Sequence, residues 1–229
     1  MHATSSTSLV RRLAAAWSPP SLSLKPWVAL LALGLAPGLY AGPYLQQFFP
    51  LCNGDSRDFT GTQGNAQVAT STVNYRGQSG FQLRITAGSG TTATEQRRYY
   101  RVDGDRLLYL GAQFYLGPES FEATFNPPIV FLNEGTVGSG GVMEGSTSAI
   151  LRGSGLPSAG FGVRVEYRYD VRLTGSLRVP ACLYADSRSV EGSFTLIDPT
   201  DPEDPETIEM PEFIYLAPGV GLTEFASTA

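Results

Sequence analysis

One stretch of the chain, from Phe161 to Thr174, alternates apolar and polar residues without interruption. Its apolar members are Phe161, Val163, Val165, Tyr167, Tyr169, Val171 and Leu173, and the residues between them are Gly162, Arg164, Glu166, Arg168, Asp170, Arg172 and Thr174. Residues two apart share a face of a strand, so the pattern predicts a β-strand with one buried and one solvated face. Charges on the solvated face alternate in sign, which favours cross-strand ion pairs over a binding patch of one sign.

Shorter segments with the same alternation recur between turn-forming sequences. They are Phe81 to Ile85, Leu108 to Leu116 and Phe121 to Phe125, with further candidates at Val68 to Tyr75, Arg97 to Val102, Val190 to Ile197 and Glu212 to Leu216. In the second segment, alternation places Leu108, Leu110, Ala112, Phe114 and Leu116 on one face.

The separating sequences contain Gly, Pro, Asn and Asp, which favour turns. The clearest hairpin signal is Asp103-Gly104 between two apolar runs; the other separators are Arg76 to Gly80, Gly117 to Glu119 and Asn126-Pro127-Pro128. The Gly- and Ser-rich stretch from Asn133 to Gly160 is predicted to be a long connection with one weak strand around Ser146 to Leu151. No helical periodicity follows residue 41, so we expect an all-β fold, either an antiparallel sandwich or a partly open curved β barrel.

Residues 1–41 have the features of an export signal. Arg11, Arg12 and Lys25 precede a short apolar run, Trp27 to Ala36, and small residues follow it, with cleavage expected after Gly38 or Ala41. The run is shorter than the roughly 20 residues of a membrane-spanning helix; a retained amphipathic or membrane anchor is the alternative. The predicted organisation is therefore a signal peptide (1–41) and a single exported β domain (42–229) located in the periplasm, at the cell surface or outside the cell.

Removal of the signal would change the composition of the chain. The only His, Lys and Trp residues are His2, Lys25, Trp17 and Trp27, all before residue 42. Of 16 cationic residues, 13 arginines remain against 21 acids, which gives a net charge of −8. Nucleic acid and anionic lipid bind clustered positive charge, so neither is an expected partner.

Two cysteines, Cys52 and Cys182, lie at opposite ends of the predicted domain. In an oxidising compartment an even pair predicts a disulfide, with a single possible connectivity. Two buried thiols are one alternative. A lipid-modified Cys52 is another, although Phe49-Pro50-Leu51 before it lacks the small residues of a lipobox.

Most catalytic chemistries lack their side chains in residues 42–229. Serine nucleophiles need a base such as His, and Schiff-base chemistry needs Lys. Paired carboxylates alone can hydrolyse glycosides; the candidates beside predicted strands are Glu95, Asp103, Asp105, Glu122, Glu166 and Asp170, which are equally expected as solvated surface charges. We expect no catalytic residue and no cofactor.

Two further clusters have a functional and a structural interpretation. The acidic, Pro-rich loop at 198–209 holds Asp198, Asp201, Glu203, Asp204 and Glu206, which offer oxygen ligands for calcium but lack EF-hand spacing, so a solubilising loop is favoured and no metal site is expected. The second cluster interleaves Arg97, Arg98, Arg101 and Arg106 with Tyr99, Tyr100 and Tyr109. Such a mixture can bind anionic ligands, and it also occurs on solvated strand faces.

Three segments resemble exported bacterial lipoproteins and secreted domains of unknown function, the DUF3108-like and TapB-like groups. The first, YLQQFFPLCNGD (44–55), is similar to their "YFPL..G" start. The second, YYRVDGDRLLYLG (99–111), is similar to their "DG" hairpin, and FNPPIVFL follows it where those proteins carry "f.PP...lP". The third, FIYLAPGVGLTEF (213–225), is similar to their "YAPGVGL" end. The resemblance implies a cell-envelope or secreted β domain and brings no catalytic residues. In the last segment Pro218, Gly219 and Gly221 predict a tight turn, because glycine tolerates positive φ.

The sequence thus favours a non-enzymatic exported domain with a binding or structural role. Its expected partner is a protein or an apolar small molecule held between curved sheets, peripheral association with the cell envelope is compatible with this class, and a monomer is expected. A small outer-membrane β barrel and a carboxylate-only glycosidase are the competing hypotheses.

Overall fold

The described residues of this computed structural model, 22–24, 42–51, 53–61, 64–87, 94–116, 118–179, 182–198 and 207–226, form twelve strands and two short helices. In chain order these are β1 (Leu22–Leu24), α2 (Pro43–Phe48), β2 (Ser56–Gly61), β3 (Gly64–Tyr75), β4 (Gln78–Ala87), β5 (Thr94–Asp103), β6 (Arg106–Leu116), β7 (Glu119–Asn133), α3 (Glu134–Ser139), β8 (Gly141–Gly153), β9 (Phe161–Val179), β10 (Cys182–Ile197), β11 (Thr207–Ala217) and β12 (Gly221–Ala226).

Strands β2 to β12 pair antiparallel with their chain neighbours and form one continuous sheet. Between the two edge strands lies β1, which pairs with both β2 and β12 and so joins the edges. We call this junction the seam. The predicted all-β antiparallel fold is confirmed: the sheet curves round into a barrel, and among the described residues its edges are joined only through the three residues of β1.

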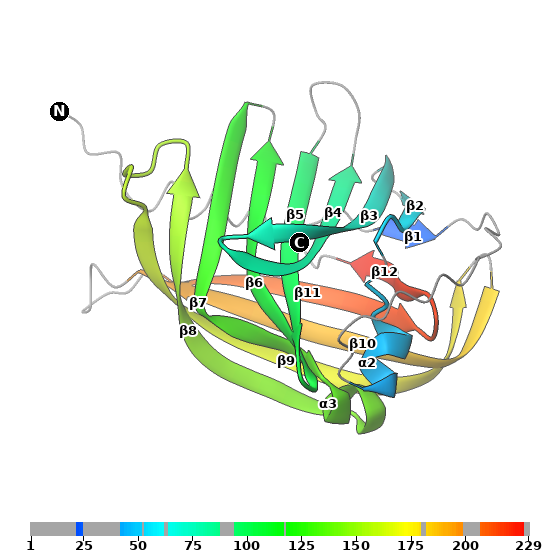
Figure 1. Ribbon diagram of the computed structural model, residues 1–229. Coiled ribbons are helices and arrows are strands. Elements are labelled where there is room, and N and C mark those ends of the chain that lie inside the picture. Colours follow the sequence, from blue (N-terminus) through cyan, green and yellow to red (C-terminus); the bar gives the residue numbers. More distant parts are fainter. Residues whose placement is uncertain are drawn as a thin grey trace.

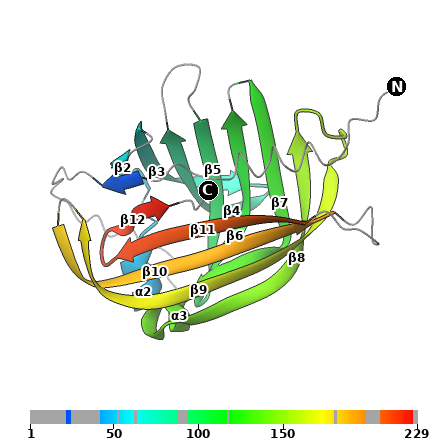
Figure 2. The same ribbon diagram turned by 180° about the vertical axis from the view of Figure 1, so that it is seen from behind.

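The sheet curves so that its two halves face each other across one core. In Figures 1 and 2 strands β5 to β7 stand side by side with the upper part of β4, and the long strands β8 to β11 sweep across them. Such crossing of strand directions is the orthogonal mode of sheet packing. Rings from both halves meet, since Phe131 of β7 and Tyr169 of β9 have centroids 5.0 Å apart. Helices α2 and α3 lie together at one end of the barrel (Figure 1) and add Leu45, Phe48 and Val137 to the core.

Strand β9 follows the predicted alternation over most of its length. Val163, Val165, Tyr169 and Val171 are buried in the core. Leu173, expected on the same face, is instead 54% exposed. At this point the pairing with β10 shifts register between Ser187 and Arg188, and a bulge of this kind changes which side chains face the core.

A second bulge overturns the predicted face of β6. Tyr109 lies in the main core together with Ala112 and Phe114, whereas Leu108 and Leu110 belong to a separate apolar cluster with Tyr75 and Tyr99. The reason is that the pairing of β6 with β7 shifts register between Tyr109 and Gly111. An extra residue in one strand reverses the alternation beyond it.

Two connections were predicted wrongly. Asn126-Pro127-Pro128 does not end a strand: β7 runs through it, and its prolines are paired with neither β6 nor β8, so no ladder hydrogen bond needs their missing N–H groups. Residues 133–160 are not a long connection. They form α3, begun by an Asn133 cap on the Thr136 N–H, and the 13-residue strand β8, which pairs along its length with β9.

Candidate binding site

A shallow cleft, partly open to solvent and enclosing only about 20 Å³, lies next to the seam. Its buried lining is mostly apolar and comprises Phe49, Leu51, Val68, Thr70 and Leu83. We call it the seam cleft. Its apolar lining residues belong to the main hydrophobic core, so the cleft lies directly against that core.

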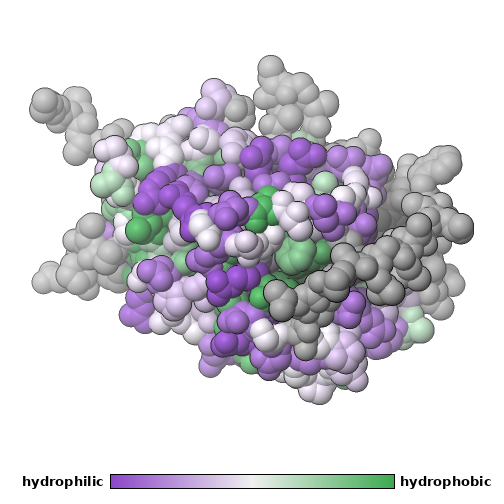
Figure 3. All heavy atoms as spheres, in the orientation of Figure 1, coloured by the Kyte–Doolittle hydropathy of each residue, from purple (hydrophilic) through white to green (hydrophobic). Residues whose placement is uncertain are grey.

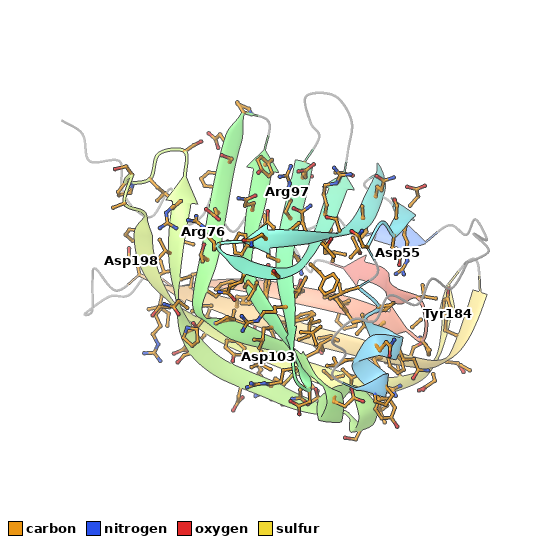
Figure 4. The ribbon with its side chains drawn as sticks, viewed as in Figure 1. Asp55, Arg76, Arg97, Asp103, Tyr184 and Asp198 are labelled. Atoms are coloured by element: carbon orange, nitrogen blue, oxygen red, sulfur yellow. The ribbon has the colours of Figure 1, made fainter. Side chains whose placement is uncertain are left out.

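The mouth of the seam cleft carries an ion pair. Asp55 and Arg57 lie at the start of β2, half-buried, with Oδ2 and Nη2 3.7 Å apart. Figure 4 shows Asp55 beside the end of the molecule where β1 and β2 lie. An apolar floor below a charged rim suits a ligand with an apolar body and a polar end.

Of the residues of the turn predicted at Pro218, Gly219 and Gly221, Gly221 lines the seam cleft from the side of β12. Pro218 to Val220 join β11 to β12, and φ is +70° at Gly219 and +77° at Gly221. Gly219 donates its N–H to the carbonyl oxygen of Gln47 in α2, at 2.7 Å. A Cβ on Gly221 would lie 3.0 Å from Pro50 and 3.2 Å from Arg57, so glycine allows β12 to approach the seam cleft closely.

Helix α2, which leads into the lining residues, is held by two charged side chains. The carboxylate of Glu134 accepts the backbone N–H groups of Tyr44, at 2.8 Å, and Leu45, at 3.0 Å. The guanidinium of Arg188 lies 4.3 Å from the centroid of the Phe48 ring and donates to the carbonyl oxygen of Val137 at 2.7 Å. These contacts fix α2 against α3 and β10 and thereby position Phe49 and Leu51.

Behind the seam cleft, aromatic rings fill the barrel. The Tyr100 centroid lies 5.0 Å from that of Tyr109 and 5.5 Å from that of Phe131, and the centroids of Tyr169 and Phe194 are 5.6 Å apart. Such contacts add about 0.5 to 1.5 kcal/mol each to the burial of the rings. An apolar ligand held deep between the sheets would have to displace them, so the seam cleft is the better candidate.

A buried ion pair crosses the core. Arg98 of β5 donates through Nη1 to Glu212 of β11, and through Nη2 to Oε1 of Gln96 at 3.4 Å. The side chains of Arg98 and Glu212 are 1% and 3% exposed. Burial opposes the charge of Arg98, but Glu212 outweighs it, and the pKa of Arg98 is raised, so it stays charged.

Two tyrosines near this pair have hydroxyl groups without a hydrogen-bond partner among the described atoms. They belong to Tyr109 and Tyr169, both fully buried. Burial raises the pKa of each well above its ordinary value, because an anion is costly in an apolar core.

The candidate carboxylates do not form a catalytic pair. Five of the six contact an arginine: Glu95 with Arg97, Asp103 with Arg106, Glu122 with Arg76 of the β3–β4 turn, Glu166 with Arg164, and Asp170 with Arg172. The sixth, Asp105, lies in the β5–β6 turn, where its backbone oxygen accepts from Glu134. Across the described residues these carboxylates neutralise arginines rather than face one another.

The arginine cluster predicted at Arg97, Arg98, Arg101 and Arg106 is dispersed. Arg98 points into the core, Arg97 stacks over Tyr115 at 4.7 Å, Arg101 donates to Gln78, and Arg106 pairs with Asp103. Figure 4 places Arg97 and Asp103 at opposite ends of β5. The alternation of β5 could have shown this separation, since it puts Arg98 on the face of Tyr100.

Other predicted sites fall partly outside the described residues. In the acidic loop, Asp198 is described and buried, and Asp201, Glu203, Asp204 and Glu206 lie outside. Cys52 and the side chain of Cys182 are also outside, so the disulfide stays a prediction. In the part of the chain that is described, no three His, Cys, Asp or Glu side chains are grouped to hold a metal ion.

Comparisons with protein-family models, curated proteins and solved structures gave no match. None of the helices among the described residues is long and apolar enough to span a membrane.

Proposed function

We propose that this chain is a non-enzymatic exported β domain that binds a ligand at the seam cleft and acts in the cell envelope or outside the cell. The observation that carries the proposal is the seam cleft itself, where apolar core residues form the floor of a cleft beside the Asp55–Arg57 pair. Aromatic side chains fill the described interior behind the seam cleft. We therefore assign ligand binding to the seam cleft and stabilisation of the fold to the aromatic core.

The ion pairs that five of the six candidate carboxylates form with arginines support a binding role over a glycosidase. Residues 42–229 also lack His and Lys, the usual proton-transfer and nucleophilic side chains. The resemblance to the DUF3108-like and TapB-like groups points to the same class and stays an expectation.

The outward face of β9 argues against an outer-membrane barrel. Arg164 pairs with Glu166, Arg168 with Glu144, and Arg172 with both Asp170 and Glu191. A lipid-facing surface would be apolar at these positions. On the face in Figure 3 hydrophilic residues likewise predominate, and hydrophobic ones form small separate areas.

Ligand binding can be tested with the neutral fluorescent probe N-phenyl-1-naphthylamine and the full chain. Thr70 is buried in the cleft lining, so Thr70→Phe fills the cleft; Thr72→Phe, at an exposed position of the same strand, is the matched control. We expect Thr70→Phe to reduce probe binding at least tenfold and Thr72→Phe to leave it unchanged. Equal binding by both variants, or no binding by the native chain, would reject the seam cleft as an apolar site.

Export is tested separately by producing the full-length chain in a bacterial host with a periplasm and measuring the mass of the recovered protein. The proposal expects a product that begins at residue 39 or 42 and contains no alkylatable thiol before reduction, because Cys52 and Cys182 would be joined. A cytosolic product of full mass would refute export, and two free thiols in an exported product would refute the disulfide.

A further inference from the structure

The two edges of the sheet run in the same direction at the seam. Strand β1 pairs antiparallel with β12, through Leu22 with Phe225 and Ser23 with Glu224, and antiparallel with β2, through Ser23 with Thr60 and Leu24 with Phe59. Two neighbours that are both antiparallel to one strand are parallel to each other. The edges therefore cannot complete the antiparallel order of the sheet by pairing directly.

The width of the seam corresponds to a single strand. Neighbouring strands lie about 4.8 Å apart, so the edges that flank β1 are separated by roughly 9 to 10 Å. An edge strand presents N–H and C=O groups to whatever lies beside it, and these groups need a partner when they are shielded from water. An extended segment fits this space, and its backbone can hydrogen-bond to the edge N–H and C=O groups of both β2 and β12.

Strand β1 covers only one end of each edge. It reaches Phe59 and Thr60 in β2 and Glu224 and Phe225 in β12. At the other end β2 begins with Ser56 and Arg57 and β12 with Gly221, next to the seam cleft. The seam cleft thus lies next to the ends of β2 and β12 that β1 leaves uncovered, and a strand longer than β1 would extend toward its apolar lining.

We propose that the seam is a strand-accepting site, which in the exported protein binds an extended segment of a partner polypeptide antiparallel to β2 and β12. The proposal rests on the proposed function, because Leu22–Leu24 lie within the predicted signal peptide and leave the seam when it is removed. In the full chain the backbone of Leu22–Leu24 pairs with both edges, so a partner segment needs an extended backbone without proline at the paired positions.

The seam cleft, which β1 does not reach, requires two further properties of a partner segment. Side chains over the seam cleft meet the apolar lining of Phe49, Leu51 and Val68, so they should be apolar. A polar or charged group at the cleft mouth meets the Asp55–Arg57 pair. Backbone pairing supplies affinity in this mode of recognition, and the alternate side chains supply specificity.

The test uses the full chain and a strand supplied in trans. Leu22→Pro with Leu24→Pro removes two backbone donors and disrupts β1, whereas Leu9→Pro with Leu13→Pro alters the signal outside β1. The probe is a fluorescein-labelled peptide of residues 18–27, and its Ser23→Pro form is the control peptide. Anisotropy reports affinity, and amide hydrogen exchange reports the place of binding.

Because a tethered strand competes at an effective concentration of about millimolar, the native chain should bind the peptide weakly. The β1-disrupted variant should bind it at least tenfold more tightly than the native chain and the Leu9/Leu13 variant, with new protection at one amide of the pair Phe59/Thr60 and one of the pair Glu224/Phe225. The Ser23→Pro peptide should not bind. A variant that folds only when the peptide is added also supports the proposal.

Three results would overturn the strand-accepting proposal. They are equal peptide binding by all three chains, new amide protection away from β2 and β12, and a disrupted variant that neither binds the peptide nor is folded by it. Dimerisation of the disrupted variant with both edges protected would assign the seam to a second copy instead. Signal cleavage is measured in another experiment, so the two proposals can fail separately: a retained signal refutes export, and a cleaved signal with no peptide binding refutes strand acceptance alone.

Discussion

Replacing Arg98 by Met should destabilise the barrel strongly, because it leaves the buried carboxylate of Glu212 without its guanidinium. Both side chains are almost fully buried, on strands from opposite halves of the barrel. Breaking such a pair by removing one partner costs about 3 to 5 kcal/mol, whereas replacing both partners by apolar residues is often neutral or stabilising. We therefore expect Arg98→Met to lower the free energy of unfolding by about 4 kcal/mol, and Arg98→Met with Glu212→Leu to recover most of that loss.

The assay is equilibrium urea unfolding at neutral pH, followed by near-ultraviolet circular dichroism of the core tyrosines. The matched control is the surface pair Arg168–Glu144, whose side chains are 58% and 65% exposed and whose variants should each change stability by less than about 1 kcal/mol. If Arg98→Met costs less than about 1 kcal/mol, or the double variant loses the sum of the single losses, the pair does not couple the two halves.

Three further variants test separate contacts. Tyr169→Phe removes a buried hydroxyl without a hydrogen-bond partner among the described atoms and should stabilise the fold by about 1 kcal/mol in neutral urea titrations; a loss of stability would show that the hydroxyl is bonded. Because the pKa of Tyr169 is raised in the folded chain, above pH about 10 the unfolded chain releases a proton that the folded chain keeps. The free energy of unfolding therefore falls by up to about 1.4 kcal/mol per pH unit in this range, and Tyr169→Phe should reduce that slope. Glu134→Gln should cost about 1 kcal/mol and lower the protection of the Tyr44 and Leu45 amides in hydrogen exchange, since a neutral amide accepts these bonds less strongly; unchanged protection would contradict this role. Gly221→Ala should lower the melting temperature more than Gly219→Ala, because both have positive φ but only the former meets neighbouring atoms, and equal effects would contradict the close approach at the seam cleft.

Local patterns predicted the parts of this fold that depend on local order. The alternation in β9 and the Asp103-Gly104 turn are confirmed, since period-two burial and turn chemistry are encoded within a few residues. Strand β8 was missed over most of its length because its Gly- and Ser-rich sequence has weak β-propensity, and its pairing with β9 outweighs that weakness.

Bulges and long-range contacts were beyond such patterns. The register shift near Leu110 depends on how β6 meets β7, so alternation alone put Leu108 and Leu110 on the wrong face. The Arg98–Glu212 pair was within reach: alternation places Arg98 beside Tyr100 and Glu212 beside Ile214, two charges on inward faces that each require a partner. Because they lie 114 residues apart in the chain, the local pattern could not predict that they pair with each other.

The seam cleft could not have been found from the sequence, because its lining is assembled from segments far apart in the chain. Only the turn at Pro218, Gly219 and Gly221 signalled one of its walls. Nothing in the alternation of β2 or β12 identified them as edges, since an edge strand is defined by the strand that it lacks.

The most direct test of the seam is amide hydrogen exchange on the full chain with and without Leu22→Pro and Leu24→Pro. If β1 is what joins the edges, the amides that face it, one in each of the pairs Phe59/Thr60 and Glu224/Phe225, should lose protection in the variant, while those of Val163 to Val171 in β9 keep theirs. Unchanged protection at the four edge residues would contradict the account, because the edges would then be closed by something other than the strand that the seam accepts.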